Sequence, residues 1–491
     1  MRSLIISTLA AAVLCLASPS AQAVLSYWVS NTNNSGPGSL REAIVTANSQ
    51  SDDVVRIYFL AQDYPQNGTI QLLGPLPVIT KRDFAIEGGN SNPRIIAHDG
   101  STTAIMNFSH TVERIGITGM RFEGGRSHSS GGCIAAGRSN INDPRMIVTI
   151  GQSQFTDCQS IAQDNVNTAG GAIIVRNTFA WMTVQDTLFS NNRVFNDTTG
   201  FASGGGGAIS FLGESLRIEN SRFYNNRAEL IFANGGAIST GTNLTQLVLR
   251  DSIFANNRAA GETHPSHGGA ISSGCFADCQ IFFEQNYFTN NQAAYGGVAY
   301  LRRSNVGDRI TADLMNNTFH ANQASQAGGA LVLDHTVPEL HFNTFENNSA
   351  PSGAHLYVTS SILGYISHNA LGHVSSGDTG CHFDGSTGPA AYSKFNAFIA
   401  SSCAQKLQPG ATLLATTAPY ALDVSHEMPV IAYAADGPLT DTGATGIDCL
   451  SLDARGNQRP QDGNGDGIAR CDIGAYERPN PWHIFSDGFE P

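Results

Sequence analysis

The residues best suited to chemistry fall in two short segments, VAYLRR and ALVLDH, which both begin directly after a glycine pair. If these segments lie on successive turns of a repeat, Arg302 and Arg303 stack against Asp334 and His335, with Tyr300 beside them. Arginine presents a planar, permanently charged fork of donors, and aspartate supplies an acceptor. The patch therefore suits an acidic or neutral glycan. The alternative is an exposed Arg302–Asp334 ion pair without function, which would contribute little stability.

A second candidate site is the segment DGNGDG at 462–467, which is similar to the start of a calcium-binding loop. Asp462, Asn464 and Asp466 stand at the first, third and fifth positions, and Gly467 supplies the turn at the sixth. Such a loop ends in a bidentate acid at its twelfth position, where this chain has Ile473. A calcium site and a plain turn rich in Asp and Gly both stay open, and no other cofactor is predicted.

The elements that position these residues belong to a repeat, because one phrase recurs along the chain. The phrase is an aromatic residue, an Asn three positions later, and then a glycine pair followed by small apolar residues. The aromatic residue recurs in steps of 26 to 34 residues, at Phe122, Phe155, Phe189, Phe223, Phe254, Phe288, Phe319 and Phe345. The Asn recurs at Asn192, Asn226, Asn257, Asn291, Asn322 and Asn348. The second glycine recurs at Gly132, Gly171, Gly207, Gly236, Gly269, Gly297 and Gly329, with Gly353 in a degenerate copy.

No stretch inside a repeat is long or periodic enough for a stable helix, so three short strands and three turns are predicted per repeat. Each repeat would form one coil of an all-β, parallel β-solenoid. Equivalent residues of successive coils would then lie about 4.8 Å apart. The Phe column would fill the core, the Asn column would pass amide hydrogen bonds between coils, and the glycines would permit a tight corner.

The segment GPGSLREAIVTANS at 36–49 predicts a short helix that caps the first coil. Ser39 and Glu42 form an S-x-x-E capping box, and one apolar stripe follows, at Leu40, Ala43, Ile44 and Ala47. A solenoid needs such a cap because an open end exposes strand edges. Strands are predicted at 54–59, 68–73 and 83–88. The β-helix with its cap is assigned to residues 24–400, and a β- and loop-rich C-terminal region to 401–491.

Residues 1–23 have the features of a secretory signal peptide. Arg2 precedes an apolar run from Leu4 to Leu16, and Ala21-Gln22-Ala23 supplies the cleavage site. The run is too short to span a membrane, and no later stretch approaches the required length. The mature chain is therefore predicted to be exported and to contain no transmembrane segment.

Eight cysteines remain after removal of the signal, an even number that fits disulfides in an exported protein. Eight cysteines allow 105 connectivities. We choose the pairs of sequence neighbours, Cys133–Cys158, Cys275–Cys279, Cys381–Cys403 and Cys449–Cys471.

Charged residues make up only 14% of the chain, and the formal net charge is −13. Abundant Gly, Asn, Ser and Thr suit short strands joined by turns. Because the composition gives no basic face, nucleic acid is not an expected partner. The expected partner is a polysaccharide or a cell-surface glycan.

The two ends of the mature chain resemble a known family. GPGSLREAI near the start and CDIGAYE at 471–477 are similar to the ends of bacterial exported β-helix proteins of the CSLREA type with a choice-of-anchor Q C-terminal region. The segment DARGNQRPQDGNGDGIARCDIGAYE at 453–477 carries the second likeness, and the internal repeats are similar to those of chlamydial polymorphic outer-membrane proteins. The resemblance implies a right-handed parallel β-helix, a solenoid of the pectate lyase kind, located outside the bacterial cell or on its outer surface.

Two classes of function remain for such a chain. The first is a noncatalytic, adhesin-like β-helix that binds glycans or surfaces. The second is a polysaccharide lyase or glycoside hydrolase acting on an acidic polysaccharide. A lyase needs a basic residue beside acidic calcium ligands, yet Lys81, Lys394 and Lys406 all lie outside the repeat core. Because no acid–base set is recognisable, no catalytic residue is assigned and binding without turnover is the preferred prediction.

Overall fold

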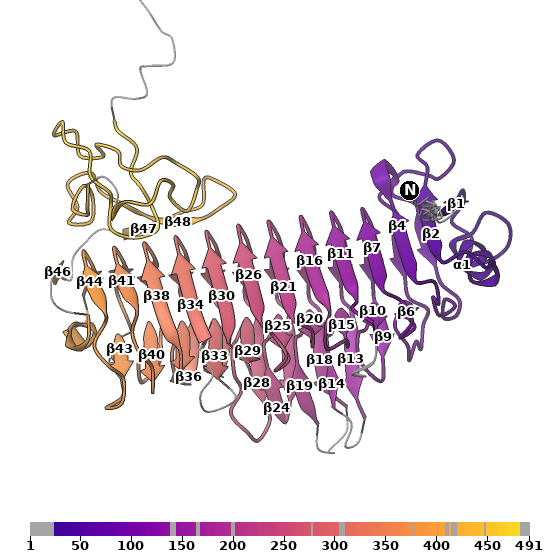
Figure 1. The fold of residues 1–491 in the computed structure, drawn as a ribbon, viewed down its shortest axis with the longest axis horizontal. Helices are drawn as coiled ribbons and strands as arrows, with labels where there is room; N and C mark the ends of the chain where they lie inside the picture. Colours follow the sequence, from indigo (N-terminus) through magenta and orange to yellow (C-terminus); the bar gives the residue numbers. More distant parts are fainter. Residues whose placement is uncertain are drawn as a thin grey trace, which may run out of the picture.

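Short strands in which buried and exposed residues alternate wind into a parallel β-helix (Figure 1). The structure, a computed structural model, describes residues 24–137, 144–163, 167–197, 202–275, 278–303, 310–375, 377–399, 401–407, 412–413, 420–445 and 448–481. The all-β fold predicted from the repeats is confirmed. The predicted signal peptide, residues 1–23, lies outside the described residues.

Two sheets of 13 parallel strands run along the whole solenoid. Sheet A consists of β1 (Val24–Val29), β2 (Val54–Phe59), β4 (Asp83–Glu87), β7 (Arg114–Thr118), β11 (Ile147–Gly151), β16 (Trp181–Gln185), β21 (Ser215–Glu219), β26 (Gln246–Arg250), β30 (Cys279–Glu284), β34 (Ile310–Met315), β38 (Val337–His341), β41 (Tyr365–Ser367) and β44 (Tyr392–Lys394). Sheet B consists of β3 (Thr69–Gln71), β5 (Arg94–Ile96), β8 (Arg121–Glu123), β12 (Gln154–Thr156), β17 (Leu188–Ser190), β22 (Arg222–Tyr224), β27 (Ile253–Ala255), β31 (Tyr287–Thr289), β35 (Thr318–His320), β39 (Thr344–Glu346), β42 (Ala370–Leu371), β45 (Ala397–Phe398) and β46 (Thr412–Leu413).

Three further parallel sheets complete the coils. Sheet C has ten strands, β6 (Met106–Phe108), β10 (Ile134–Ala136), β15 (Ile173–Val175), β20 (Ile209–Phe211), β25 (Ile238–Thr240), β29 (Ile271–Cys275), β33 (Ala299–Arg303), β37 (Leu331–Asp334), β40 (Leu356–Thr359) and β43 (Cys381–Phe383). Sheet D has seven, β9 (Arg126–Ser127), β13 (Gln159–Ala162), β18 (Arg193–Asn196), β23 (Arg227–Leu230), β28 (Arg258–Gly261), β32 (Gln292–Tyr295) and β36 (Gln323–Ala327). A small sheet joins β14 (Thr168–Ala169), β19 (Ser203–Gly205) and β24 (Phe232–Asn234).

The prediction of three strands per coil is wrong for the central coils. Between residues 215 and 240, the chain forms β21, β22, β23, β24 and β25 in succession. The additional strands include the segment that follows the repeated Asn. This segment is extended, and it pairs in register with its counterparts on neighbouring coils as sheet D.

The Phe column fills the core as predicted. Strand register joins Phe122 to Phe345 through every intervening repeat. The rings stack face to face with centroids 4.6–5.2 Å apart. Each ring is buried, so the column forms a continuous apolar spine.

Two polar ladders close the corners on either side of sheet B. The predicted Asn ladder is present, and Asn226 Nδ2 donates to Asn257 Oδ1 at 2.9 Å in the same way as its equivalents on other coils. The second ladder, between sheets A and B, was not predicted. It runs through Ser153, Thr187, Ser221, Ser252, Asn286, Asn317, Asn343, Asn369 and Asn396.

The glycine pair forms the corner before sheet C. The first glycine adopts a positive φ, for example 65° at Gly235. A Cβ atom added to the second, Gly236, would lie 2.1 Å from the carbonyl oxygen of Gly269 on the next coil. Backbone therefore packs directly on backbone at this corner, which only glycine permits.

The predicted capping helix is α1 (Leu40–Ser49). The Ser39 hydroxyl accepts a 3.2 Å hydrogen bond from the Glu42 amide, and the four residues of the predicted stripe are buried. The winding begins earlier than predicted, because β1 precedes this helix and pairs with β2. Two short 3-10 helices, η1 (Gly89–Ser91) and η2 (Ser401–Gln405), lie in the connections.

The described residues from 420 to 481 form a C-terminal lobe that packs against the corner between sheets A and B (Figure 1). Apart from an antiparallel pair, β47 (Tyr420–Asp423) and β48 (Val430–Tyr433), the lobe is largely irregular. Asn316 Nδ2 donates to the Leu452 carbonyl oxygen at 2.9 Å, and the hydroxyls of Thr344 and Tyr433 lie 2.8 Å apart. One strand of the solenoid, β46, falls beyond the predicted boundary at residue 400.

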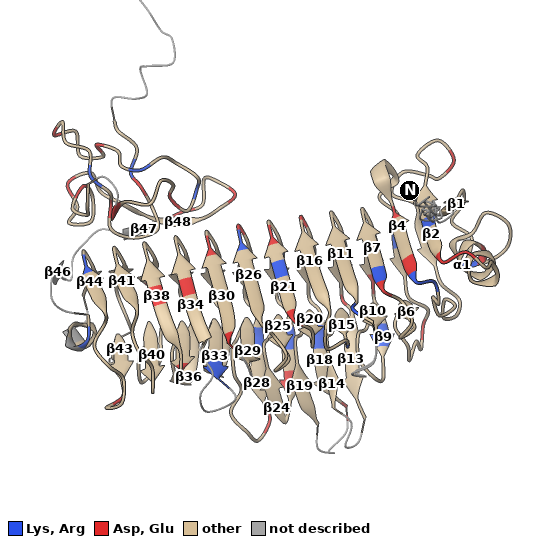
Figure 2. Ribbon diagram, in the orientation of Figure 1, with Lys and Arg blue, Asp and Glu red and all other residues tan. Residues whose placement is uncertain are grey.

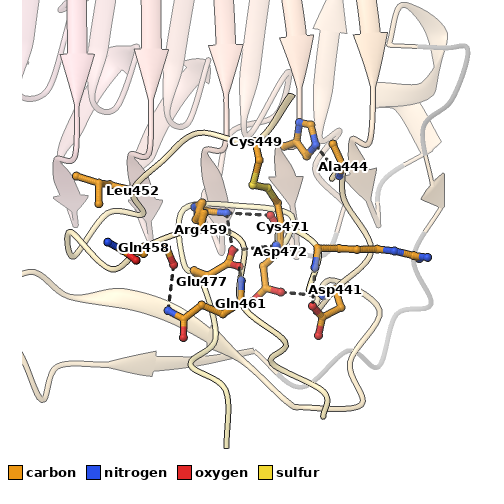
Figure 3. Close-up of a disulfide and its surroundings, with 12 residues drawn as sticks. Asp441, Ala444, Cys449, Leu452, Gln458, Arg459, Gln461, Cys471, Asp472 and Glu477 are labelled. Carbon is orange, nitrogen blue, oxygen red and sulfur yellow. Dashed lines mark hydrogen bonds and ion pairs between the residues drawn. A yellow bond between two sulfur atoms is a disulfide. The ribbon is translucent and has the colours of Figure 1, made fainter. Parts of the chain in front are cut away.

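A buried ionic cluster organises the lobe (Figure 3). Arg459 Nη1 lies 3.1 Å from Glu477 Oε2, and both side chains are fully buried. The Arg459 guanidinium also lies 4.5 Å from the ring centroid of Phe342, which belongs to the solenoid. Burial and the neighbouring Glu477 charge raise the pKa of Asp472, whose oxygens accept hydrogen bonds from two backbone amides of the lobe.

The structure brings the four predicted cysteine pairs together. Cα–Cα distances are 5.6, 6.2, 4.8 and 6.0 Å for Cys133–Cys158, Cys275–Cys279, Cys381–Cys403 and Cys449–Cys471. Disulfides of this number fit an extracellular protein. In the part of the chain that the structure describes, no helix has the length and apolar character needed to cross a bilayer.

Candidate functional site

A groove of about 950 Å³ runs along the edge of sheet A at which its strands begin. It is lined by residues from the starts of six successive strands, β16, β21, β26, β30, β34 and β38. Six strands at about 4.8 Å spacing give a groove roughly 24 Å long. Its lining residues include Trp181, Ser215, Gln246, Gln280, Thr311 and Glu339.

Trp181 is the aromatic residue of this groove, and it is held in place. The Arg145 guanidinium lies over the ring, 4.3 Å from its centroid, while the indole Nε1 donates to Glu214 Oε2 at 3.2 Å. Arg145 also pairs with this same oxygen at 3.1 Å. The Trp181 side chain is nevertheless 45% exposed. One aromatic surface is therefore fixed and available to a ligand.

Electrostatically, the groove is acidic. Glu214, Asp278 and Glu339 all line it. Asp313 lies on β34, two residues after Thr311, which lines the groove. It is the register neighbour of Glu339 on the next coil, and Figure 2 shows the two acidic positions as adjacent red bands on β34 and β38. Burial, and then the charges of Glu339 and Glu284, raise the pKa of Asp313 to about 6.

The structure brings part of the predicted patch together on the outer surface of sheet C. Arg302 is the register neighbour of Asp334, as predicted. The ion pair of the alternative interpretation does not form among the described residues: Asp334 Oδ1 contacts His335 Nδ1 at 2.7 Å and accepts from the Thr359 hydroxyl at 2.8 Å. His335 lies at the turn after β37, with a φ of 55°.

Two rings that were not predicted, those of His267 and Tyr295, complete this patch. The His267 ring lies 4.5 Å from the ring of Tyr300 and 5.7 Å from that of Tyr295. Burial and the nearby Arg302 charge lower the pKa of His267, which favours the neutral imidazole. Burial and the Asp334 charge raise the pKa of Tyr300.

The patch and the groove adjoin through a short disulfide turn. Arg303 of the patch is the register neighbour of Cys275. Cys275 forms a disulfide with Cys279, and Cys279 lines the groove. Two histidines that follow the patch in the sequence lie elsewhere in the fold. His341 is on sheet A, and His355 is buried inside the solenoid, where burial lowers its pKa to about 4.

The predicted calcium ligands lie in an exposed turn of the C-terminal lobe. Asp462 Oδ1 accepts from the backbone amides of Gly465 and Asp466, at 2.8 and 3.0 Å. Asp466 Oδ1 accepts from the Ile468 amide at 2.8 Å. These side chains thus cap their own turn. Within the described ranges, no group of three or more His, Cys, Asp or Glu side chains is arranged to hold a metal.

Sequence reasoning missed the groove, although one signal was available. In the strand WMTVQ at 181–185, the apolar Met182 and Val184 face the core, so Trp181 must face outward. A large aromatic residue at an outward strand position has no packing role in the core. Comparisons of the chain with models of known families, with curated proteins and with solved structures give no significant match.

Proposed function

We propose that this protein is an extracellular, noncatalytic β-helix that binds glycans in the groove of sheet A. The export signal predicted for residues 1–23 and the four disulfides support a location outside the cell. The resemblance to bacterial exported β-helix proteins supports the same location, at the cell surface or in the medium.

The observation that carries the proposal is the fixed, half-exposed Trp181 within a long open groove. An indole can stack on the apolar face of a sugar ring, while amide, hydroxyl and carboxylate groups bind its hydroxyls. Gln246, Gln280 and Thr311 supply such groups on successive coils. Because the groove is acidic, it favours a neutral glycan over a uronic acid polymer. The patch around Tyr300 and Arg302 adjoins the groove and extends the contact surface.

The test is retention on immobilised neutral polysaccharides, with chromatography of the soluble products in parallel. We expect at least one linear neutral polymer, such as a β-glucan or a xylan, to retain the protein without being shortened. Trp181→Ala should weaken retention about tenfold, since an aromatic contact contributes about 1.5 kcal/mol beyond its area. Trp28→Ala removes an indole that is 54% exposed on β1 and should leave retention unchanged. Absence of retention on every neutral polymer refutes the proposal.

A glycoside hydrolase is the second candidate, and the pair Asp313–Glu339 favours it. Glycosidases use two carboxyl groups, one of which has a raised pKa and acts as general acid. Asp313 has such a raised pKa and stands next to the groove residue Glu339. If wild-type protein shortens a retained polymer and Asp313→Asn abolishes the cleavage, this second function replaces the first.

A further inference from the structure

The outer surface of sheet D carries an Arg or Gln at the same position on seven successive coils. These residues, the sheet D ladder, are Arg126, Gln159, Arg193, Arg227, Arg258, Gln292 and Gln323. Each is the register neighbour of the next, so their backbones lie about 4.8 Å apart. Figure 2 shows arginine positions on β9 and β18 of this sheet.

A column of outward asparagines runs beside the ladder. Three repeats contain the sequence N-N-R, at 191–193, 225–227 and 256–258. The second Asn is the buried member of the Asn ladder, whereas the first is exposed at the corner with a φ of 57–58°. Each of these coils therefore presents one amide and one guanidinium, two positions apart, to solvent.

The positive charge of the sheet D ladder is only partly compensated. Glu229 lies 2.5 Å from Arg193 and 3.8 Å from Arg227. Arg258 is exposed and forms no ion pair with any residue of the described ranges. It lines a pocket of about 310 Å³ together with Gln292 and Gln323. Like charges at this spacing repel one another, so an anion placed between them would be bound favourably.

We propose that the sheet D ladder binds a linear acidic polysaccharide that lies along the axis of the solenoid. The planar guanidinium fork matches carboxylate groups. Asn and Gln amides both donate and accept, which suits sugar hydroxyls. A polymer with one anionic group per repeating unit meets an equivalent set of side chains on each coil. A DNA backbone, which offers acceptors only, would leave the amide oxygens without donors from the ligand.

This site is distinct from the groove, and its test is independent of the proposed function. The groove is acidic and contains Trp181, whereas the sheet D ladder is basic. The expectation from composition that the chain has no basic face is therefore wrong for sheet D. Trp181→Ala should therefore leave binding of an acidic polymer unchanged. Failure of neutral glycans to bind would refute the groove proposal without affecting the sheet D ladder.

The experiment is a calorimetric titration of the full chain with a polygalacturonate oligomer long enough to span four coils. We expect saturable binding that weakens as salt is added. The double variant Arg227→Gln, Arg258→Gln should weaken it at least about tenfold, because it removes two guanidinium groups that form charge-assisted hydrogen bonds with carboxylates.

The matched control is Arg82→Gln, Arg114→Gln, which removes the same charge from exposed positions on the first coils, outside sheet D. It should change the affinity less than about twofold, because exposed charges act weakly beyond the Debye length of about 8 Å. Three outcomes would overturn the proposal: no saturable binding to wild-type protein, equal losses in both double variants, or tighter binding of single-stranded DNA than of polygalacturonate.

Discussion

The Asn226 side chain donates to Asn257 Oδ1 at 2.9 Å, and Asn257 donates in turn to Asn291 Oδ1 at 3.0 Å. Each amide also donates to a backbone carbonyl, as Asn257 does to Phe223 at 2.9 Å. A single side chain thus joins three coils. Such a network is stable only while every member is paired.

Replacing one member of this ladder should therefore be costly. Asn257→Ala removes the acceptor that the Asn226 backbone amide and Nδ2 share, and the side-chain donor to the Phe223 carbonyl oxygen, all inside the core. Asn226 Nδ2 keeps its bond to the Phe189 carbonyl oxygen. We expect a loss of about 3 kcal/mol or more, at about 1–3 kcal/mol per buried unpaired group. Urea denaturation measures this loss in the free energy of unfolding. The exposed neighbour Asn256, replaced by Gly at its positive φ, should change the stability by less than about 0.5 kcal/mol.

Gly236→Ala tests the backbone contact at the glycine corner. The added methyl group would meet Gly269 and Arg258 backbone atoms at 2.1 and 2.5 Å, so neighbouring coils must separate. We expect a loss of about 2–4 kcal/mol and faster amide exchange in the adjacent coils. Gly74→Ala is the control, because its methyl group would have no atom within 4 Å. Equal effects of the two changes would contradict the packing described.

Asp313 should make stability depend on pH. Its pKa is raised from 3.8 to about 6, so the folded state binds more protons than the unfolded state between these values. Stability therefore falls as pH rises through this window. Asp313→Asn should add about 1–2 kcal/mol above pH 6, after allowance for solvent screening, and nothing below pH 4. Denaturation midpoints at pH 4 and pH 7.5 measure the difference. The control is Glu229→Gln, which breaks the pairs with Arg193 and Arg227 on sheet D, away from Asp313, and should not stabilise the protein at either pH.

Removing only the positive member of the buried Arg459–Glu477 pair should destabilise the C-terminal lobe more than removing both charges. Arg459→Met leaves Glu477 and Asp472 buried without a positive partner, at a cost of about 3–5 kcal/mol. We expect the lobe to become sensitive to proteolysis while the solenoid stays resistant. Adding Glu477→Gln should restore much of the resistance. Unchanged proteolysis of Arg459→Met would show that the pair does not hold the lobe.

The core could be predicted from sequence because a solenoid demands one residue type at one position on every coil. Phe122 to Phe345 and the Asn ladder are therefore visible as a period. The second ladder uses Ser, Thr and Asn in turn, and this mixture hides its period. Sheet D was missed because its strands follow the repeated Asn in segments of unequal length. The groove and the docking of the lobe depend on residues far apart in sequence, such as Asn316 and Leu452, which no local pattern connects.

The most direct test of glycan binding in the groove is the fluorescence of Trp181 itself. The chain contains three tryptophans, so the variant Trp28→Phe, Trp482→Phe leaves Trp181 as the only indole. We titrate this variant with a neutral oligosaccharide derived from the polymer that retains the protein. The Trp181 emission should change saturably, and the dissociation constant should agree with the affinity measured by retention. If the protein binds the glycan while the Trp181 emission stays constant, the groove is not the binding site.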